Sequence, residues 1–118
     1  MASFIYNSAK VKLGDGNIDW DTDTIKVTLH TSSYTPDKDN DVFFSSVTNE
    51  LSGGGYTSGG YTIANTAVTQ DNTNDRATYD GDDIQITGLT GTFRYIVVRK
   101  NTGADATSPV IALIDLGS

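Results

Sequence analysis

Alternation of apolar and polar residues predicts a strand over residues 24–31. Every second residue from Ile25 to Leu29 is apolar and the positions between them are polar, which is the period of a strand buried on one face. Two continuous apolar runs with β-branched residues predict further strands over residues 93–99 and 110–116. Such runs are typical of strands covered on both faces, so we expect these two strands inside a sheet.

A different spacing near the amino terminus predicts a short helix over residues 3–13. The apolar residues that recur there at three- and four-residue intervals are Phe4, Ile5, Ala9 and Leu13. Gly14 and Gly16 end this segment, because glycine adopts the left-handed conformation that terminates helices. Residues 42–47 form either one further helical turn, which we favour, or the start of an extended segment, and we expect an ordered loop around Trp20.

Turn-forming residues separate the remaining predicted strands. We expect strands at residues 61–69 and 77–87 on either side of a polar turn, with a bulge near Gly81. A glycine-dense segment, residues 53–60, connects the first half of the chain to these strands. Asp, Asn, Gly and Thr are abundant and favour turns and strands over helix. The pattern therefore predicts an all-β domain with a short N-terminal helix.

Length and charge narrow the classes of function. A chain of 118 residues makes one domain, spanning residues 1–118. The net charge of -7 argues against a nucleic-acid partner, which needs an electropositive surface. The chain has no cysteine, which excludes disulfides, thiolate metal ligands and a cysteine nucleophile. No membrane-spanning stretch or secretion signal is visible, so we expect a soluble protein with no membrane partner.

Candidate catalytic residues are few. His30 is the only histidine, so a Ser-His-Asp or zinc site has at most one imidazole, and we interpret His30 as an exposed or partly packed strand residue. Asp115 follows an apolar strand and is interpreted as the first solvated residue at the strand end. A small hydrolase with paired aspartates is the least favoured reading, because no base or nucleophile accompanies them. The sequence predicts no active site, cofactor or small-molecule substrate.

Three alternate acidic residues, Asp37, Asp39 and Asp41, resemble the start of some calcium loops. The match ends there, because Val42 stands where such a loop needs glycine and Thr48 where it needs a bidentate glutamate. A solvated acidic loop is the favoured interpretation, and no metal site is predicted.

Aromatic residues lie in or beside several predicted loops. They are Trp20, Tyr34, Tyr56, Tyr61 and Tyr79. Side chains of this kind anchor loops, form subunit contacts or make a platform for carbohydrate, and their positions in the sequence do not separate these roles. Trp20, Tyr34 and Tyr61 are the candidates for an interface.

Several short motifs follow one another along the chain. They are Ile18–Val27 with Leu29, Tyr34–Pro36, Thr48–Glu50, Gly55–Gly60, Asp80–Ile84, Arg94–Tyr95 and Ile111–Gly117. Together, in this order and over nearly the whole chain, they resemble a family of small structural proteins from tailed bacteriophages. Gly55, Tyr56, Gly59 and Gly60 match the most recognisable segment of that family, and the resemblance implies a structural role for them.

The resemblance implies a jelly-roll-like β-sandwich and a non-enzymatic role in the virion. The expected function is that of a capsid decoration protein, or cement protein, on the outer head surface after synthesis in the host cytoplasm. The expected partners are the major capsid protein and copies of the chain itself, for which a trimer is one arrangement. The alternative is a host-surface or carbohydrate-binding module on a tail or fibre.

The chain departs from the family at its carboxyl end. Similar proteins continue into a further apolar strand, whereas this chain stops at Ser118. Either the chain is a shorter member of the family, or the sandwich leaves an open edge at its carboxyl end, to which a strand of a neighbouring subunit would add.

Overall fold

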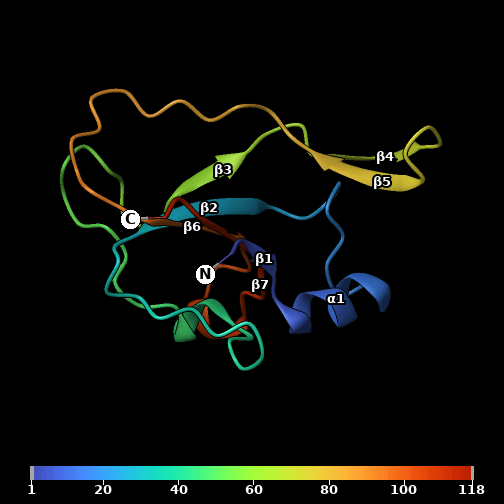
Figure 1. Ribbon diagram of the computed structural model, residues 1–118, viewed down its shortest axis with the longest axis horizontal. Helices are drawn as coiled ribbons and strands as arrows, with labels where there is room; N and C mark the ends of the chain where they lie inside the picture. The colour runs from blue at the N-terminus through green and yellow to red at the C-terminus, as the bar shows by residue number, and fades with distance from the viewer. Residues whose placement is uncertain (1, 118) are drawn as a thin grey trace.

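The computed structural model describes residues 2–117, which form two antiparallel sheets, one of five strands and one of two, with one short α-helix (Figure 1). The strands are β1 (Phe4–Ile5), β2 (Ile25–His30), β3 (Tyr61–Ile63), β4 (Ala67–Asp71), β5 (Arg76–Asp80), β6 (Tyr95–Lys100) and β7 (Val110–Asp115). The helix is α1 (Asn7–Gly14), and two 3-10 turns are η1 (Phe44–Ser46) and η2 (Asp105–Thr107). The expectation of a mostly β protein with a short N-terminal helix is confirmed.

The larger sheet has the strand order β1-β7-β6-β2-β3. Strand β2 pairs with β6 along its whole length, from Ile25 opposite Lys100 to His30 opposite Tyr95. Strand β6 also pairs with β7, with an irregularity of register after Val98. The three strands predicted from alternation and from apolar runs are confirmed, and β6 and β7 lie inside the sheet as expected. The predicted turn at residues 42–47 is also confirmed, as η1.

The first residues of the chain were predicted as helix and are instead a strand. Phe4 pairs with Leu113 and Ile5 with Ala112 on β7, so α1 begins only at Asn7. Strand β7 therefore has β6 on one side and β1 on the other. The hypothesis of an open carboxyl-terminal edge is thus wrong, because a strand of this same chain occupies it.

The predicted strand at residues 61–69 is divided between the two sheets. Strand β3 pairs with β2, whereas β4 pairs only with β5. We call the ribbon formed by β4, β5 and their turn, residues 67–80, the arm; Figure 1 shows it extending away from the larger sheet. The strand predicted at residues 77–87 ends at Asp80, and residues 81–94 cross above the larger sheet without regular structure.

One face of the larger sheet is sealed by the chain between β2 and β3. On that face Thr28, Val97 and Leu113 occupy neighbouring register positions and are almost completely buried. Tyr34 and Phe44, from the covering segment, belong to the same core cluster as Val97 and Leu113. The covering segment therefore closes this side of the sheet, and the same core cluster continues on the other side at Val98 and Ile111.

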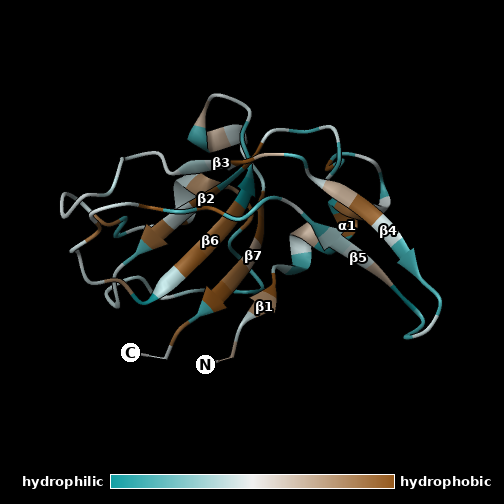
Figure 2. Ribbon diagram, turned by 90° about the horizontal axis from the view of Figure 1, so that it is seen from above, coloured by the Kyte–Doolittle hydropathy of each residue, from teal (hydrophilic) through white to brown (hydrophobic). Residues whose placement is uncertain are grey.

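The opposite face, which we call the open face, carries Val27, Val98 and Ala112 in one row across three strands. Near Leu29 it is covered by a smaller apolar cluster that includes Tyr56. In Figure 2 the apolar strands β6 and β7 face the viewer, and the two-stranded sheet of β4 and β5 lies to one side of them. Apolar surface is left accessible on this side of the molecule.

Candidate functional site

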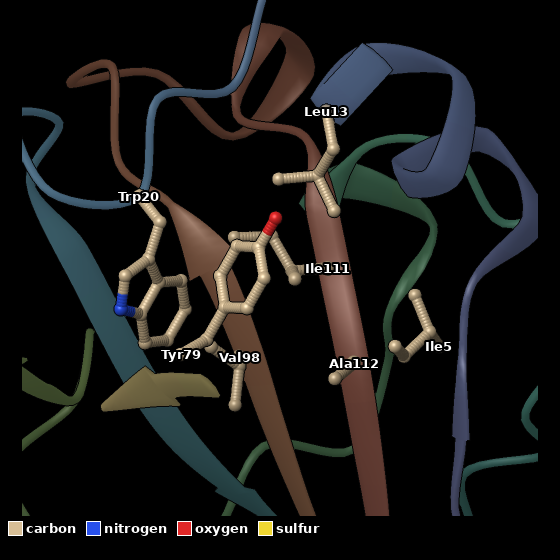
Figure 3. Close-up of a pocket in the computed structure, with 7 residues that line it drawn as sticks. All are labelled: Ile5, Leu13, Trp20, Tyr79, Val98, Ile111 and Ala112. Atoms are coloured by element: carbon tan, nitrogen blue, oxygen red, sulfur yellow. The ribbon is translucent and has the colours of Figure 1, made fainter. Parts of the chain in front are cut away.

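The candidate site is an apolar hollow on the open face, with a volume of about 360 Å³. The residues that line it, drawn in Figure 3, are Ile5, Leu13, Trp20, Tyr79, Val98, Ile111 and Ala112. We call this hollow the groove. Its residues come from β1, α1, the loop after α1, β5, β6 and β7, so the complete fold is needed to form it.

The floor of the groove is aliphatic and is set by strand pairing. Val98 and Ala112 lie opposite each other on β6 and β7, and Ile5 lies opposite Ala112 on β1. These residues share a face because cross-strand partners project to the same side of a sheet. The irregularity after Val98 leaves Ile111 without a register partner on β6, and Ile111 also lines the groove. The pairing of β1, β7 and β6 thus places short and branched side chains at the bottom of the groove.

One wall of the groove is aromatic. The rings of Trp20 and Tyr79 meet edge to face, with their centroids 5.9 Å apart, a geometry that aromatic pairs favour. The indole Nε1 of Trp20 donates a hydrogen bond to the carbonyl oxygen of Asp80 at 2.9 Å. This pairing joins the loop after α1 to the base of the arm. Tyr79 keeps 47% of its surface exposed, so the wall faces the solvent.

The segments that hold this wall are acidic. Residues 15–23, which carry Trp20, contain four aspartates and no basic residue, and residues 80–83, which follow Tyr79, contain three. Asp23 forms an ion pair with Lys100 at 3.2 Å, while Asp19 and Asp21 are exposed. A hydrogen bond between these two carboxyls raises the pKa of Asp21 and lowers that of Asp19. The groove is therefore apolar inside and negatively charged along its aromatic side.

Of the aromatic residues proposed for an interface, only Trp20 lies at the groove. Tyr34 is a core residue with 2% of its surface exposed. Its hydroxyl donates to the carboxylate of Asp41 at 2.7 Å and accepts from Tyr6, and its burial raises its pKa. Tyr34 does not reach the surface and is removed from the interface candidates. Tyr61 packs against Tyr56 and accepts a hydrogen bond from the backbone N–H of Thr57.

The glycine loop, residues 53–60, packs beneath β2 through a buried tyrosine. Tyr56 donates its hydroxyl proton to Glu50, which also accepts from the backbone N–H of Gly59. Gly55 and Gly60 have φ values of 84° and 86°. A Cβ atom at Gly55 would overlap the backbone of Gly88, and one at Gly60 would overlap the carbonyl oxygen of Val27. These residues shape the core next to β2 and lie outside the groove lining.

His30 is completely buried, contrary to its interpretation as an exposed or partly packed residue. Its Nδ1–H donates to the carbonyl oxygen of Thr48 at 2.8 Å, and its Nε2 accepts from the hydroxyl of Thr28. Burial lowers the pKa of His30. Arg99 lies on the same face of the sheet and stacks on Phe44, with the guanidinium carbon 3.9 Å from the ring centroid. These polar side chains are built into the core rather than presented to a ligand.

The predicted acidic candidates do not come together. Asp37 accepts hydrogen bonds from the backbone of its own turn, whereas Asp41 is buried against Tyr34. Asp115, expected to be solvated, has a side chain that is 1% exposed and forms two hydrogen bonds with Arg94. That ion pair lowers the pKa of Asp115. Within residues 2–117, no three His, Cys, Asp or Glu side chains are grouped so as to hold a metal ion.

None of the helices described between residues 2 and 117 has the length and apolarity needed to cross a membrane. Comparison of the chain with protein-family models, curated proteins and solved structures finds no match. The groove and the arm beside it are the candidate functional features of residues 2–117.

Proposed function

We propose that this protein is a non-enzymatic structural component of a bacteriophage particle, and that it decorates the outer surface of the capsid. Two observations support the proposal: the order of motifs along the chain, and the apolar groove left accessible on the open face. The groove carries the argument, because accessible apolar patches on small proteins mark the places where partners bind. The proposed partners are the major capsid protein and further copies of this chain.

The arm supports the same role. Every residue of β5 is exposed, as are the first four residues of β4. A two-stranded ribbon alone is marginally stable in water and gains stability by packing against another surface. Tyr79 and Trp20 hold the base of the arm, whereas its strands pair only with each other and are exposed over almost their whole length. In an assembled shell, a neighbouring subunit would cover these exposed strands.

The proposal includes a jelly-roll-like sandwich as the finer description of the fold. The larger sheet supplies one layer. Residues 81–94, which run above the larger sheet in Figure 1, and the base of the arm, which reaches the groove through Tyr79, supply a second, incomplete layer. A partner on the head surface would cover the part of the open face that this layer leaves accessible.

Charge and mass action suit such a role. The net charge of -7 keeps free copies apart in solution. A protein that binds only the assembled shell stabilises that shell in proportion to its occupancy, so many copies of modest affinity have a large combined effect. No chemical step is required of the protein.

The test is to locate the protein in purified particles by electron cryo-microscopy at a resolution that traces side chains. Density repeated over the head lattice, with the open face against a capsid subunit, is the expected result. Density confined to the tail or a fibre would replace the proposal with the host-binding alternative. Absence of the protein from purified particles would overturn both.

A further inference from the structure

We propose that the groove binds a protein segment that presents one apolar side chain flanked by lysine or arginine. The inference rests on the proposed function, because a capsid subunit would supply that segment. The proposed function names a capsid subunit as the partner. The further step is to say which kind of sequence in that partner binds the groove.

The shape of the groove selects the apolar side chain. Its floor of Val98 and Ala112 offers only carbon atoms, and Ile5 and Leu13 extend this surface on the side away from Trp20 (Figure 3). A volume of about 360 Å³ accepts a side chain as large as leucine or phenylalanine with part of its backbone. Burying such a side chain removes apolar surface from water on both partners, which favours binding. A sugar ring would instead leave its hydroxyl groups without partners on this floor.

The charge beside the groove selects what flanks that side chain. Asp19 and Asp21 stand on either side of Trp20 in the sequence, and Asp80, Asp82 and Asp83 follow Tyr79. All five are exposed. Lysine or arginine next to the inserted side chain would face the acidic segments that carry Trp20 and Tyr79. Charges at the edge of an apolar contact accelerate association and select partners more than they add affinity.

The same charge disfavours a second copy of this chain as the occupant. Two copies meeting open face to open face would bring both sets of aspartates together, and each copy carries a net charge of -7. Like charges placed opposite each other across an interface oppose association. The groove is therefore assigned to a basic partner, and contacts between copies are left to other surfaces, such as the arm.

The experiment uses three synthetic peptides and the intact protein. One peptide has a central Phe-Leu pair flanked by lysines, the second has glutamates in place of the lysines, and the third has Ser-Ser in place of Phe-Leu. Trp20 is the only tryptophan and lies in the wall of the groove, so its fluorescence reports binding directly. The expected result is saturable binding of the first peptide, with the other two weaker by about tenfold or more.

Matched variants test whether the groove is the binding site. Ala112→Phe fills the floor and is expected to weaken binding of the first peptide by about tenfold. The control is Ala67→Phe, the same change on an exposed strand of the arm, on the ribbon face opposite to Tyr79. Thermal unfolding shows whether each variant is folded.

A second pair of variants tests the charge without changing the packing of the floor. Asp21→Asn with Asp83→Asn removes two carboxylates beside the wall, and Asp75→Asn with Asp105→Asn removes two elsewhere. The first pair is expected to weaken binding about threefold at low salt, and the second to have no effect.

Equal binding of the lysine and glutamate peptides, or no binding of any peptide, would overturn the proposal. Dimerisation of the wild type that Ala112→Phe abolishes, measured by analytical ultracentrifugation, would assign the groove to a second copy instead. These outcomes are independent of particle binding. If the protein is found on the head surface but the peptides do not bind as expected, only the partner assigned to the groove is wrong. If the protein is absent from particles, the proposed function is wrong, whatever the result with the peptides.

Discussion

Gly60 and Gly59 are adjacent, and both have positive φ values, of 86° and 92°. They differ in their surroundings: a Cβ at Gly60 would overlap the carbonyl oxygen of Val27, whereas a Cβ at Gly59 would meet nothing within 4 Å. We expect Gly60→Ala to lower the free energy of unfolding by about 3 kcal/mol or more, because strained backbone and overlap add. Gly59→Ala is expected to cost about 1–2 kcal/mol from the backbone conformation alone. Chemical denaturation of both variants measures the difference, and equal losses would contradict it.

The burial of His30 predicts a loss of stability in mild acid. Burial lowers the pKa of His30 in the folded protein, while its hydrogen bond to Thr48 and the charge of Glu50 partly oppose this shift. The unfolded chain therefore takes up a proton near pH 6.5, where the folded protein does not. This contribution is fully present above that pH and declines below it, by at most about 1.4 kcal/mol per pH unit.

The measurement is urea denaturation of the wild type and of His30→Gln between pH 7.5 and 5.5. The wild type is expected to lose stability more steeply than the variant as the pH falls. The comparison concerns the slopes, because the substitution also changes the hydrogen bonds of a buried site. Parallel slopes would show that His30 titrates similarly in the folded and unfolded states.

Whether a given side chain is buried or exposed was the property that the sequence predicted least well. The alternation in β2 correctly separates two faces, yet it leads to an interpretation of His30 as exposed or partly packed, because its face carries polar residues. In the structure the chain that follows β2 folds back over that face and packs Tyr34 and Phe44 against it. Asp115 likewise pairs with Arg94, the residue before β6. Whether a polar residue is covered depends on segments distant in the sequence, which a local pattern does not contain.

At the scale of elements, β2, β6 and β7 followed from the sequence because each carries its own apolar pattern. Strand β1 did not, because Phe4 and Ile5 have the spacing of the helix that follows, and two residues are too few to show a period of two. The split at residues 64–66 was also missed. There Asn65 adopts a φ of 54°, and this left-handed residue lies where the chain passes from one sheet to the other.

The arm is expected to be the least protected pair of strands. Its strands pair only with each other and are exposed over almost their whole length, so local opening costs little free energy. Hydrogen–deuterium exchange followed by mass spectrometry should show residues 67–80 exchanging much faster than β6 and β7 in the free protein. The same residues should exchange more slowly when the protein is bound to particles. Protection of the free arm equal to that of β6 would contradict this view of the ribbon.

At the scale of the whole molecule, the excess of acidic residues predicts that salt stabilises the fold. The chain has 15 acidic and 8 basic residues, and mutual repulsion of like charges destabilises a compact state. Salt at about 0.5 M strongly screens the repulsion between these charges. We expect the Tm, measured by differential scanning calorimetry, to rise by a few degrees from low salt to about 0.5 M sodium chloride. A falling Tm would mean that ion pairs such as the one between Arg94 and Asp115 outweigh the repulsion.

The groove is a property of the whole fold, which explains why the sequence showed only part of it. Trp20 was singled out as an interface candidate, and Tyr79 was noted beside a loop. Val98 and Ala112 lie in runs that predicted strands covered on both faces, so nothing marked them as the floor of a groove. Val98 is in fact buried and Ala112 half-buried. They lie at the bottom of a groove because the second layer covers only part of the open face, and this depends on the path of the arm and of residues 81–94.

The pairing of β1 with β7 has a mechanical consequence. These strands are antiparallel and bring the two ends of the chain together, with the backbone N–H of Asp115 donating to the hydroxyl of Ser3. A force that pulled the two ends apart would act across this short pairing and open its hydrogen bonds one after another, as a zipper opens. A force that pulled on the arm and the larger sheet would not load β1 first. The molecule should therefore resist tension unequally in different directions, and its weakest connection should be at its own ends.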